Sequence, residues 1–387
     1  YDIFLPLLIE NTLSLEDISD NPVQFANAAL QFSLGDGSDE TSYKGNLKKA
    51  IAKFSRFVDG FLSFSVQFTI QVLDFIFEGC PVDKFASQFS LVKEAEQSNF
   101  ILHANSDQKI ESGLLLLTIL NIEIKERKDL LVLFQSFFFK NADIIVRTVQ
   151  SELIKIRFLN LYFSFKNHLS YQKDDDNNEY LNRIHLWILS QIQGNDALSL
   201  IAVQVVTDLI KEKKQINFFE TNQLGICETI CKVLPSTKSI SFLEFVKKFV
   251  VLQKEFFSDQ RNIFIKIFST FIQKIENEFR GSESNSKGII LSCFVFLREV
   301  TKNGMFADSF FFEIDSSLGS ILSLVQEVGT EFDEDYFDVY YSLMKNSSKV
   351  STNFDKLLDS FSKSLHTSEG DIRFFPLLSL MISRYHS

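Results

Sequence analysis

The sequence contains little proline and little glycine for its length. Five prolines and fourteen glycines are spread over 387 residues, whereas ordinary usage is roughly 5% and 7%. Because both residues interrupt regular structure, their scarcity predicts long helices joined by short connections. A chain of this length is also too long for one core of ordinary size, so it forms several domains or one elongated array.

Cysteine and basic residues are also scarce. Four cysteines are too few for a disulfide scaffold and are typical of a reducing compartment. The formal net charge of −11 argues against nucleic acid as the main partner and is compatible with a basic protein. The best candidate for a membrane span, residues 61–77, is interrupted by polar side chains, so we expect a core helix there.

Phenylalanine, in contrast, is abundant, with 43 residues against a single tryptophan. Apolar residues recur at helical spacing along most of the chain, and we expect roughly seventeen helices and no strand. The helices pair with a period of about 40 residues, which is the spacing of HEAT and armadillo repeats. The sequence therefore predicts an all-α fold: a HEAT-repeat α-α superhelix of about eight helix pairs. We expect residues 1–387 to form a single continuous array.

Three polar stretches interrupt this pattern. Residues 14–46 form an acidic, glycine-containing segment that we interpret as an insertion in the first repeat. Residues 167–179 and 281–288 are expected to be mobile surface loops. Within the first stretch, Asp20-Asn21-Pro22 is a good helix start, because an Asx cap precedes a proline near the first turn.

No catalytic constellation is recognisable in the sequence. It lacks GxxxxGK[ST], GxGxxG, GxSxG and HExxH, and its five histidines are scattered. Cys227 and Cys231 lie four residues apart on one expected helix, which fits two core thiols better than a metal site without further ligands. Residues 36–40 loosely resemble a calcium loop, but the required Gly and Glu are misplaced. We therefore expect no enzyme, no metal and no cofactor.

Two acidic runs allow two interpretations. In the first, they are solvated loops and helix N-termini, where a negative charge interacts favourably with the helix dipole. In the second, they are docking surfaces for a basic partner. The candidate residues for such a cargo surface are Asp174, Asp175, Asp176, Glu331, Asp333, Glu334 and Asp335.

The stretch Asp20-Asn21-Pro22-Val23-Gln24-Phe25 resembles the D-N-P-E-E-Y-I segment of the importin-β superfamily. The resemblance is best to exportins of the CAS type, which return importin-α to the cytoplasm with RanGTP. Residues 34–41, LGDGSDET, look like that family's L-E-G-S-D-V-D-T. Later helix pairs, from Ile144–Asn167 onward, follow in a similar order. The chain departs from the family at Val23-Gln24, where the family has an acidic pair.

This resemblance implies a nuclear transport receptor that performs no catalysis and shuttles between nucleus and cytoplasm. Its partners would be the Ran GTPase and importin-α or another basic cargo, with Phe-Gly nucleoporins as further candidates. GTP would be bound by Ran and not by this chain. By position, the residues implied to contact Ran are Asp20, Asn21, Pro22, Phe25, Asp36, Asp39 and Glu40. Plain helix capping explains the first three without any partner.

Two other functions remain open at the level of sequence. One is a generic HEAT or armadillo scaffold in another assembly, such as ribosome biogenesis, a vesicle coat or chromatin. The other is a helical enzyme, which would need a pocket with clustered titratable groups. Because the first residue is Tyr1, we expect the chain to be part of a longer protein.

Overall fold

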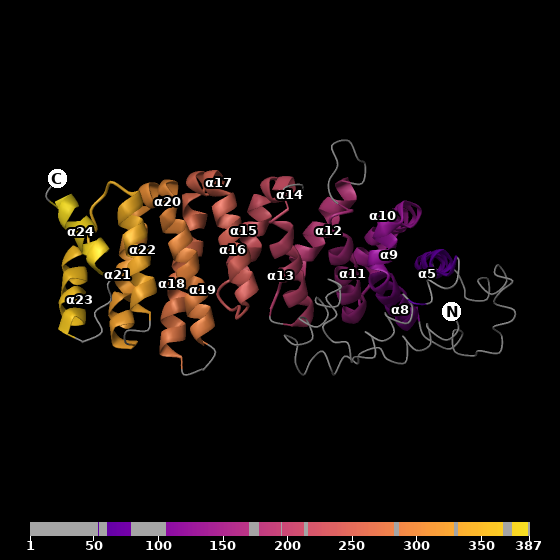
Figure 1. Cartoon of the computed structure of the whole chain (residues 1–387), viewed down its shortest axis with the longest axis horizontal. Helices are drawn as coiled ribbons and strands as arrows, with labels where there is room; N and C mark the ends of the chain where they lie inside the picture. The colour runs from indigo at the N-terminus through magenta and orange to yellow at the C-terminus, as the bar shows by residue number, and fades with distance from the viewer. Residues whose placement is uncertain are drawn as a thin grey trace. The chain divides into compact units, whose positions relative to one another are not determined.

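The computed structural model describes residues 53, 60–78, 106–169, 178–194, 196–212, 216–281, 286–328, 332–366 and 374–385. Over these ranges it contains eighteen α-helices and no strand, which confirms the all-α prediction (Figure 1). None of the described helices is long and apolar enough to cross a membrane. The chain divides into two compact units, Tyr1–Leu209 and Ile210–Ser387.

In the first unit, helices that follow one another along the chain pack into two rows. α8 contacts α11, which contacts α13, while α5 contacts α10, which contacts α12. The rows meet where α5 lies against α8. The helices of this unit are α5 (Phe61–Phe77), α8 (Ser106–Ile119), α9 (Asn121–Glu126), α10 (Lys128–Thr148), α11 (Glu152–Phe165), α12 (Asn178–Ser190) and α13 (Ala197–Leu209).

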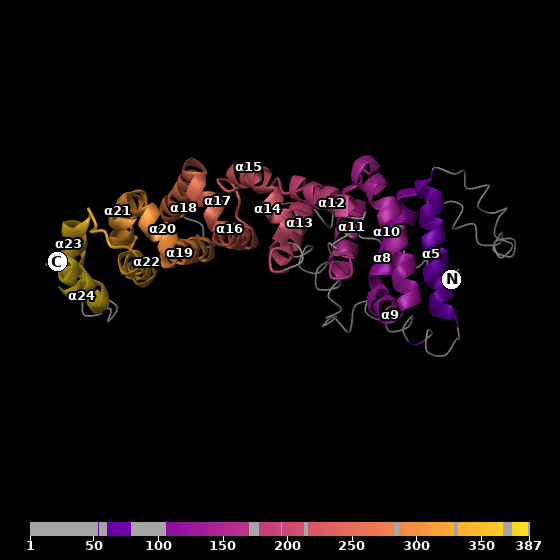
Figure 2. The same ribbon diagram turned by 90° about the horizontal axis from the view of Figure 1, so that it is seen from above.

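The second unit repeats this arrangement. One row contains α16, α19, α22 and α24, and the other contains α15, α18 and α21, as Figure 2 shows from above. Short helices α17 and α20 contact each other at the ends of the long ones. The helices of this unit are α14 (Ile216–Thr221), α15 (Gln223–Val233), α16 (Ile240–Leu252), α17 (Lys254–Asp259), α18 (Arg261–Arg280), α19 (Ser286–Lys302), α20 (Gly304–Ser309), α21 (Phe311–Val328), α22 (Asp333–Asn346), α23 (Phe354–His366) and α24 (Phe374–Tyr385).

Phenylalanine fills the space between the rows in both units. In the first unit, the rings of Phe134 and Phe165 stack with centroids 3.9 Å apart. In the second, Phe271 and Phe296 stack at 3.8 Å. All four side chains are buried. Such ring pairs contribute about 0.5–1.5 kcal/mol beyond their buried area, so the abundance of Phe is explained by packing between facing helices.

Several helix boundaries follow local signals in the sequence. Gly60 precedes α5 with φ of 81°, a left-handed conformation that costs glycine little because it has no Cβ. Ser239 precedes α16, and its side-chain oxygen accepts a hydrogen bond from the backbone N–H of Phe242. The sequence predicts a helix break at Gly60 and a helix cap at Ser239 or Ser241, and the structure has the cap at Ser239.

Other boundaries differ from expectation. The apolar spacing of residues 110–124 predicts one helix, which is wrong because the chain is interrupted at Leu120 between α8 and α9. The apolar run over residues 130–139 predicts a short helix, which is also wrong because α10 continues to Thr148. Its continuation passes through Asn141, a buried polar residue whose Nδ2 donates to the carbonyl of Phe137. The sequence also predicts a helical segment over residues 143–165 with a break inside it, and this break is confirmed between α10 and α11.

Candidate functional site

The residues that carry the family resemblance lie outside the described part of the chain. This holds for Asp20, Asn21, Pro22, Phe25, Asp36, Asp39 and Glu40. It also holds for Asp174, Asp175, Asp176 and Glu331 among the candidates for a cargo surface. Their roles therefore stay predictions.

The remaining candidates for a cargo surface, Asp333, Glu334 and Asp335, lie in the first turn of α22. Asp335 is partly buried. Burial raises the pKa of Asp335, the charge of Arg298 on α19 opposes this, and Asp338 adds to it. Arg298 also forms an ion pair with Asp338, with Nη1 and Oδ2 3.6 Å apart. The structure thus places Asp335 beside the contact between α19 and α22. It also lies at the N-terminus of α22, where a negative charge interacts favourably with the helix dipole.

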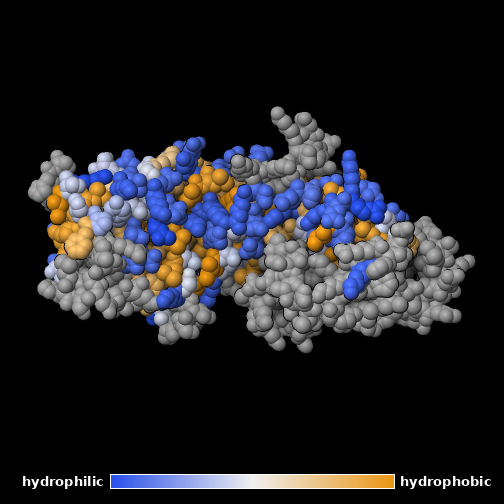
Figure 3. All heavy atoms as spheres, in the orientation of Figure 1, coloured by the Kyte–Doolittle hydropathy of each residue, from blue (hydrophilic) through white to orange (hydrophobic). Residues whose placement is uncertain are grey.

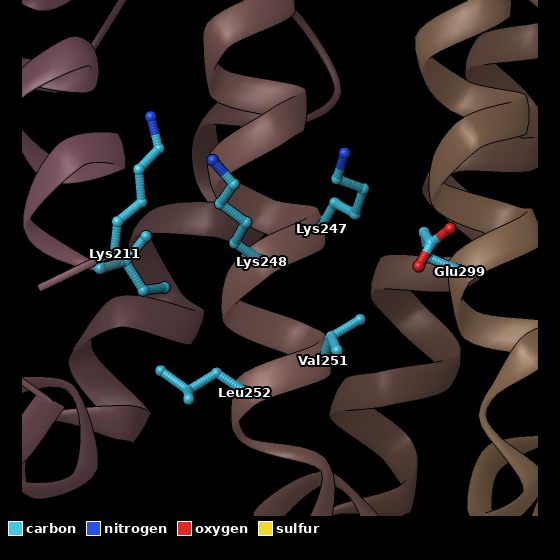
Figure 4. Close-up of a pocket in the computed structure, with 7 residues that line it drawn as sticks. Lys211, Lys247, Lys248, Val251, Leu252 and Glu299 are labelled. Carbon is cyan, nitrogen blue, oxygen red and sulfur yellow. The ribbon is translucent and has the colours of Figure 1, made fainter. Parts of the chain in front are cut away.

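A pocket of about 340 Å³ lies on the surface of the second unit (Figure 4). Helix α16 supplies four of its lining residues, α19 supplies one, and the segment before α14 supplies two. Figure 4 shows the lysine side chains extending to one side of the pocket, with Val251 and Leu252 below them. We call it the lysine pocket, lined by Ile210, Lys211, Lys247, Lys248, Val251, Leu252 and Glu299.

The charges around the lysine pocket are predominantly positive. Lys248 forms an ion pair with Glu244 one turn earlier on α16, with Nζ and Oε1 2.5 Å apart. The hydrogen bond from Lys248 is the main cause that lowers the pKa of Glu244, and the charges of Lys247 and Lys211 lower it further. All three lysines therefore lie near one carboxylate.

The other side of the pocket holds a second carboxylate. Glu299 pairs with Lys302, with Oε1 and Nζ 3.1 Å apart. Lys247 forms no hydrogen bond or ion pair with another residue that the structure describes. Four lysines against two glutamates leave the rim positive, although the whole chain has a formal net charge of −11.

A second pocket of about 420 Å³ lies between α15 and α18. Burial raises the pKa of the Cys227 thiol to about 12, and burial also raises that of Cys231, although Lys266 opposes it. Both groups are therefore protonated at neutral pH and are weak nucleophiles. We call this the cysteine pocket, lined by Leu224, Cys227, Glu228, Cys231, Lys232, Ile263 and Lys266.

Within the described ranges, no group of three His, Cys, Asp or Glu residues is placed to hold a metal ion.

Hydrophilic side chains cover much of the face in Figure 3, with hydrophobic groups between them. The lysine pocket combines cationic amines with an apolar floor, which is chemistry for binding an anionic group.

The sequence interpretation did not single out the lysine pocket. Its strongest signal is the pair Lys247-Lys248, which interrupts the apolar run of residues 242–252. Lys211 is 36 residues earlier in the sequence than Lys247, so only the fold brings its charge near the same carboxylate.

Comparisons with protein-family models and with curated proteins identify no relative of the chain. No family model matches it, and no curated protein matches it significantly. Functional inference therefore rests on the residues themselves and on their arrangement.

Proposed function

We propose that the protein is a non-catalytic binding scaffold, and specifically a nuclear transport receptor of the importin-β type. The observation that carries the scaffold is the packing of each helix on its neighbours in two rows, such as α16, α19, α22 and α24 in the second unit. Elements stacked in this way bury their apolar faces only against adjacent elements, and they present extended surfaces to partners.

The finer fold in this proposal is a HEAT-repeat superhelix. The repeated unit would be a pair of antiparallel helices, one from each row, such as α18 with α19 or α21 with α22. The period of about 40 residues and the scarcity of proline and glycine support this assignment. The short helices α17 and α20 would then belong to the connections between successive pairs.

The partners in this proposal are the Ran GTPase in its GTP form and importin-α or another basic cargo. Residues 20–41 support Ran by their resemblance to the family, and the net charge of −11 supports a basic cargo. Ran would act by binding the closed, cargo-holding form preferentially, so that each partner raises the affinity for the other. The receptor would shuttle between nucleus and cytoplasm.

A pull-down with the full-length protein tests this function. Ran locked in its GTP form is expected to be retained, and Ran loaded with GDP is expected to pass through. Importin-α should strengthen retention of RanGTP, because the coupling between two ligands is reciprocal. Absence of RanGTP binding by the full-length protein would reject the transport receptor and leave a scaffold in another assembly.

The generic scaffold is the second candidate, and the lack of any family match favours keeping it. It predicts a stable complex of defined composition that forms without Ran. Affinity purification of the full-length protein, followed by identification of proteins present in equal amounts, distinguishes the two candidates.

A further inference from the structure

We propose that the lysine pocket is a docking site for a short acidic peptide, one of whose apolar side chains enters the pocket. This partner has the opposite charge to the basic cargo considered above. The inference therefore does not depend on the proposed transport function.

The floor of the pocket suits an apolar side chain. Val251 and Leu252 lie below the lysines in Figure 4, and Ile210 completes the apolar lining. Leu252 is 37% exposed, so part of its surface is available to a partner. The volume of about 340 Å³ is at the low end for ligand pockets, which range over roughly 300–1,000 Å³. That size fits a side-chain anchor better than a large cofactor.

The rim of the pocket suits carboxylates. Lys211, Lys247 and Lys248 all line this pocket, and all three lower the pKa of Glu244. Lys247 has no ion-pair partner among the described residues, so its amine is available to an incoming carboxylate. Lys248 already pairs with Glu244, and because both side chains are only partly buried, a partner's carboxylate can reach this contact and exchange for it.

A nucleic acid fits the same charges less well. A polyanion gains affinity by contacting many lysines and arginines along its backbone. Here the lysine pocket offers three lysines, on a chain whose net charge is −11. Glu244 and Glu299 flank the lysines, and they would repel a continuous row of phosphates. A short peptide with two or three carboxylates places its charges on the lysines alone.

The experiment measures fluorescence anisotropy of a dye-labelled peptide with the full chain. The peptide places two or three Asp and Glu residues around a single leucine. The test variant is K247E/K248E, and the matched control is K232E/K266E, which makes the same charge change in the cysteine pocket. We expect K247E/K248E to weaken binding at least about tenfold, whereas K232E/K266E stays within about twofold because distant exposed charges are screened by salt.

Two further measurements separate the pocket from general charge attraction. L252S in the protein and Leu→Ser in the peptide each remove one side of the apolar contact, and each is expected to weaken binding. K247Q/K248Q removes the charges without placing new carboxylates beside Glu244, and circular dichroism checks that all variants keep their helices. Undetectable binding, or equal weakening by the two charge-reversal variants, would overturn the proposal. Tighter binding of a single-stranded oligonucleotide with the same dependence on Lys247 and Lys248 would also overturn it.

Discussion

Each unit contains a buried carboxylate, and the two are stabilised in different ways. In the first unit, Glu111 on α8 accepts hydrogen bonds from Nε and Nη2 of Arg157 on α11, both at 3.0 Å. In the second unit, Asp315 on α21 accepts only from neutral groups. Its donors are Ser351 Oγ at 2.5 Å, Thr352 Oγ1 at 2.6 Å, Thr352 N at 2.8 Å and Tyr340 Oη at 3.2 Å.

The difference shows two structural uses of a buried charge. Glu111 and Arg157 are 2% and 3% exposed and join two long helices of the same row. Their pairing favours one partner helix and one register, because a misplaced charge in an apolar interface is costly. Asp315 instead holds the connection between α22 and α23 against α21, so it determines the path of the chain between helices.

Arg157→Met is expected to have the largest effect, a loss of about 3–5 kcal/mol in the free energy of unfolding of the first unit. The substitution leaves Glu111 buried without its cationic partner. The loss of stability is measured by urea unfolding, monitored through the fluorescence of Trp187. That residue is the only tryptophan of the chain, and its ring lies 5.7 Å from the ring of Phe158, next to Arg157.

The double variant Arg157→Met/Glu111→Leu is the control. Replacing both members of a buried ion pair by apolar residues is often neutral or stabilising, so we expect most of the lost stability to return. If the double variant is as unstable as the single one, packing of the Arg157 side chain and not its charge determines the contact between α8 and α11.

Asp315→Ala is expected to lower the free energy of unfolding of the second unit by about 2–3 kcal/mol, because it leaves several hydrogen-bond donors without their acceptor. The cost should be smaller than for Arg157→Met, since residues 347–353 can shift and let water reach the hydroxyl groups. Hydrogen exchange at 347–353 should become faster while exchange in α18 and α19 stays slow. Exchange that accelerates equally in α18 and α19 would show that Asp315 supports the whole unit.

Gly319→Ala tests the same connection from the other side. A methyl group at this position would overlap the side chain of Asn353, whose Nδ2 donates to the carbonyl of Asp315 at 2.8 Å. The variant should accelerate exchange at the same residues as Asp315→Ala, without changing any charge.

Another prediction concerns the effect of acid on the first unit. His185 is buried and hydrogen-bonded to the hydroxyl of Tyr162, and burial lowers its pKa from 6.5 to about 3. The folded state therefore keeps this ring neutral while the unfolded state binds a proton below about pH 6.5. Stability contributed by the neutral ring is present above pH 6.5 and is lost as the pH falls toward 3.

His185→Gln removes the titrating group and keeps a polar side chain that can contact Tyr162. Trp187 fluorescence at pH 7.5, 6 and 4.5 should show that the difference in stability between wild type and variant shrinks or reverses on acidification. A difference that is independent of pH would show that His185 does not contribute to acid sensitivity.

Much of the fold could be predicted from the sequence, because long apolar stripes define helices without reference to the rest of the chain. The apolar spacing of residues 262–279 and 222–234 predicts two helices. They differ from α18 and α15 by about one residue at each end, within the ordinary uncertainty of helix boundaries. Six-residue helices such as α14, α17 and α20 were missed, since two turns are too short to establish a period.

The candidate site was much harder to predict. The lysine pocket depends on the approach of Lys211 to α16 and of Glu299 on α19, and sequence spacing carries no information about such contacts. The Asp315 cluster likewise joins residues from α21, α22 and the connection that follows. Neither cluster has a motif, because each is assembled by packing between helices.

The smallest effect is expected at the start of α16, the helix that carries Lys247 and Lys248. Ser239→Ala removes the acceptor of the Phe242 N–H, 3.3 Å away, and should cost about 1 kcal/mol in thermal unfolding of the second unit. Ser239→Asp keeps an acceptor and adds a favourable charge at the helix N-terminus, so it should retain stability. The lysines lie about two turns further along α16, and acidic-peptide binding should be the same in both variants. Equal destabilisation by Ala and Asp would show that the hydroxyl itself is required, and weaker peptide binding by Ser239→Ala would show that the cap also orders the pocket.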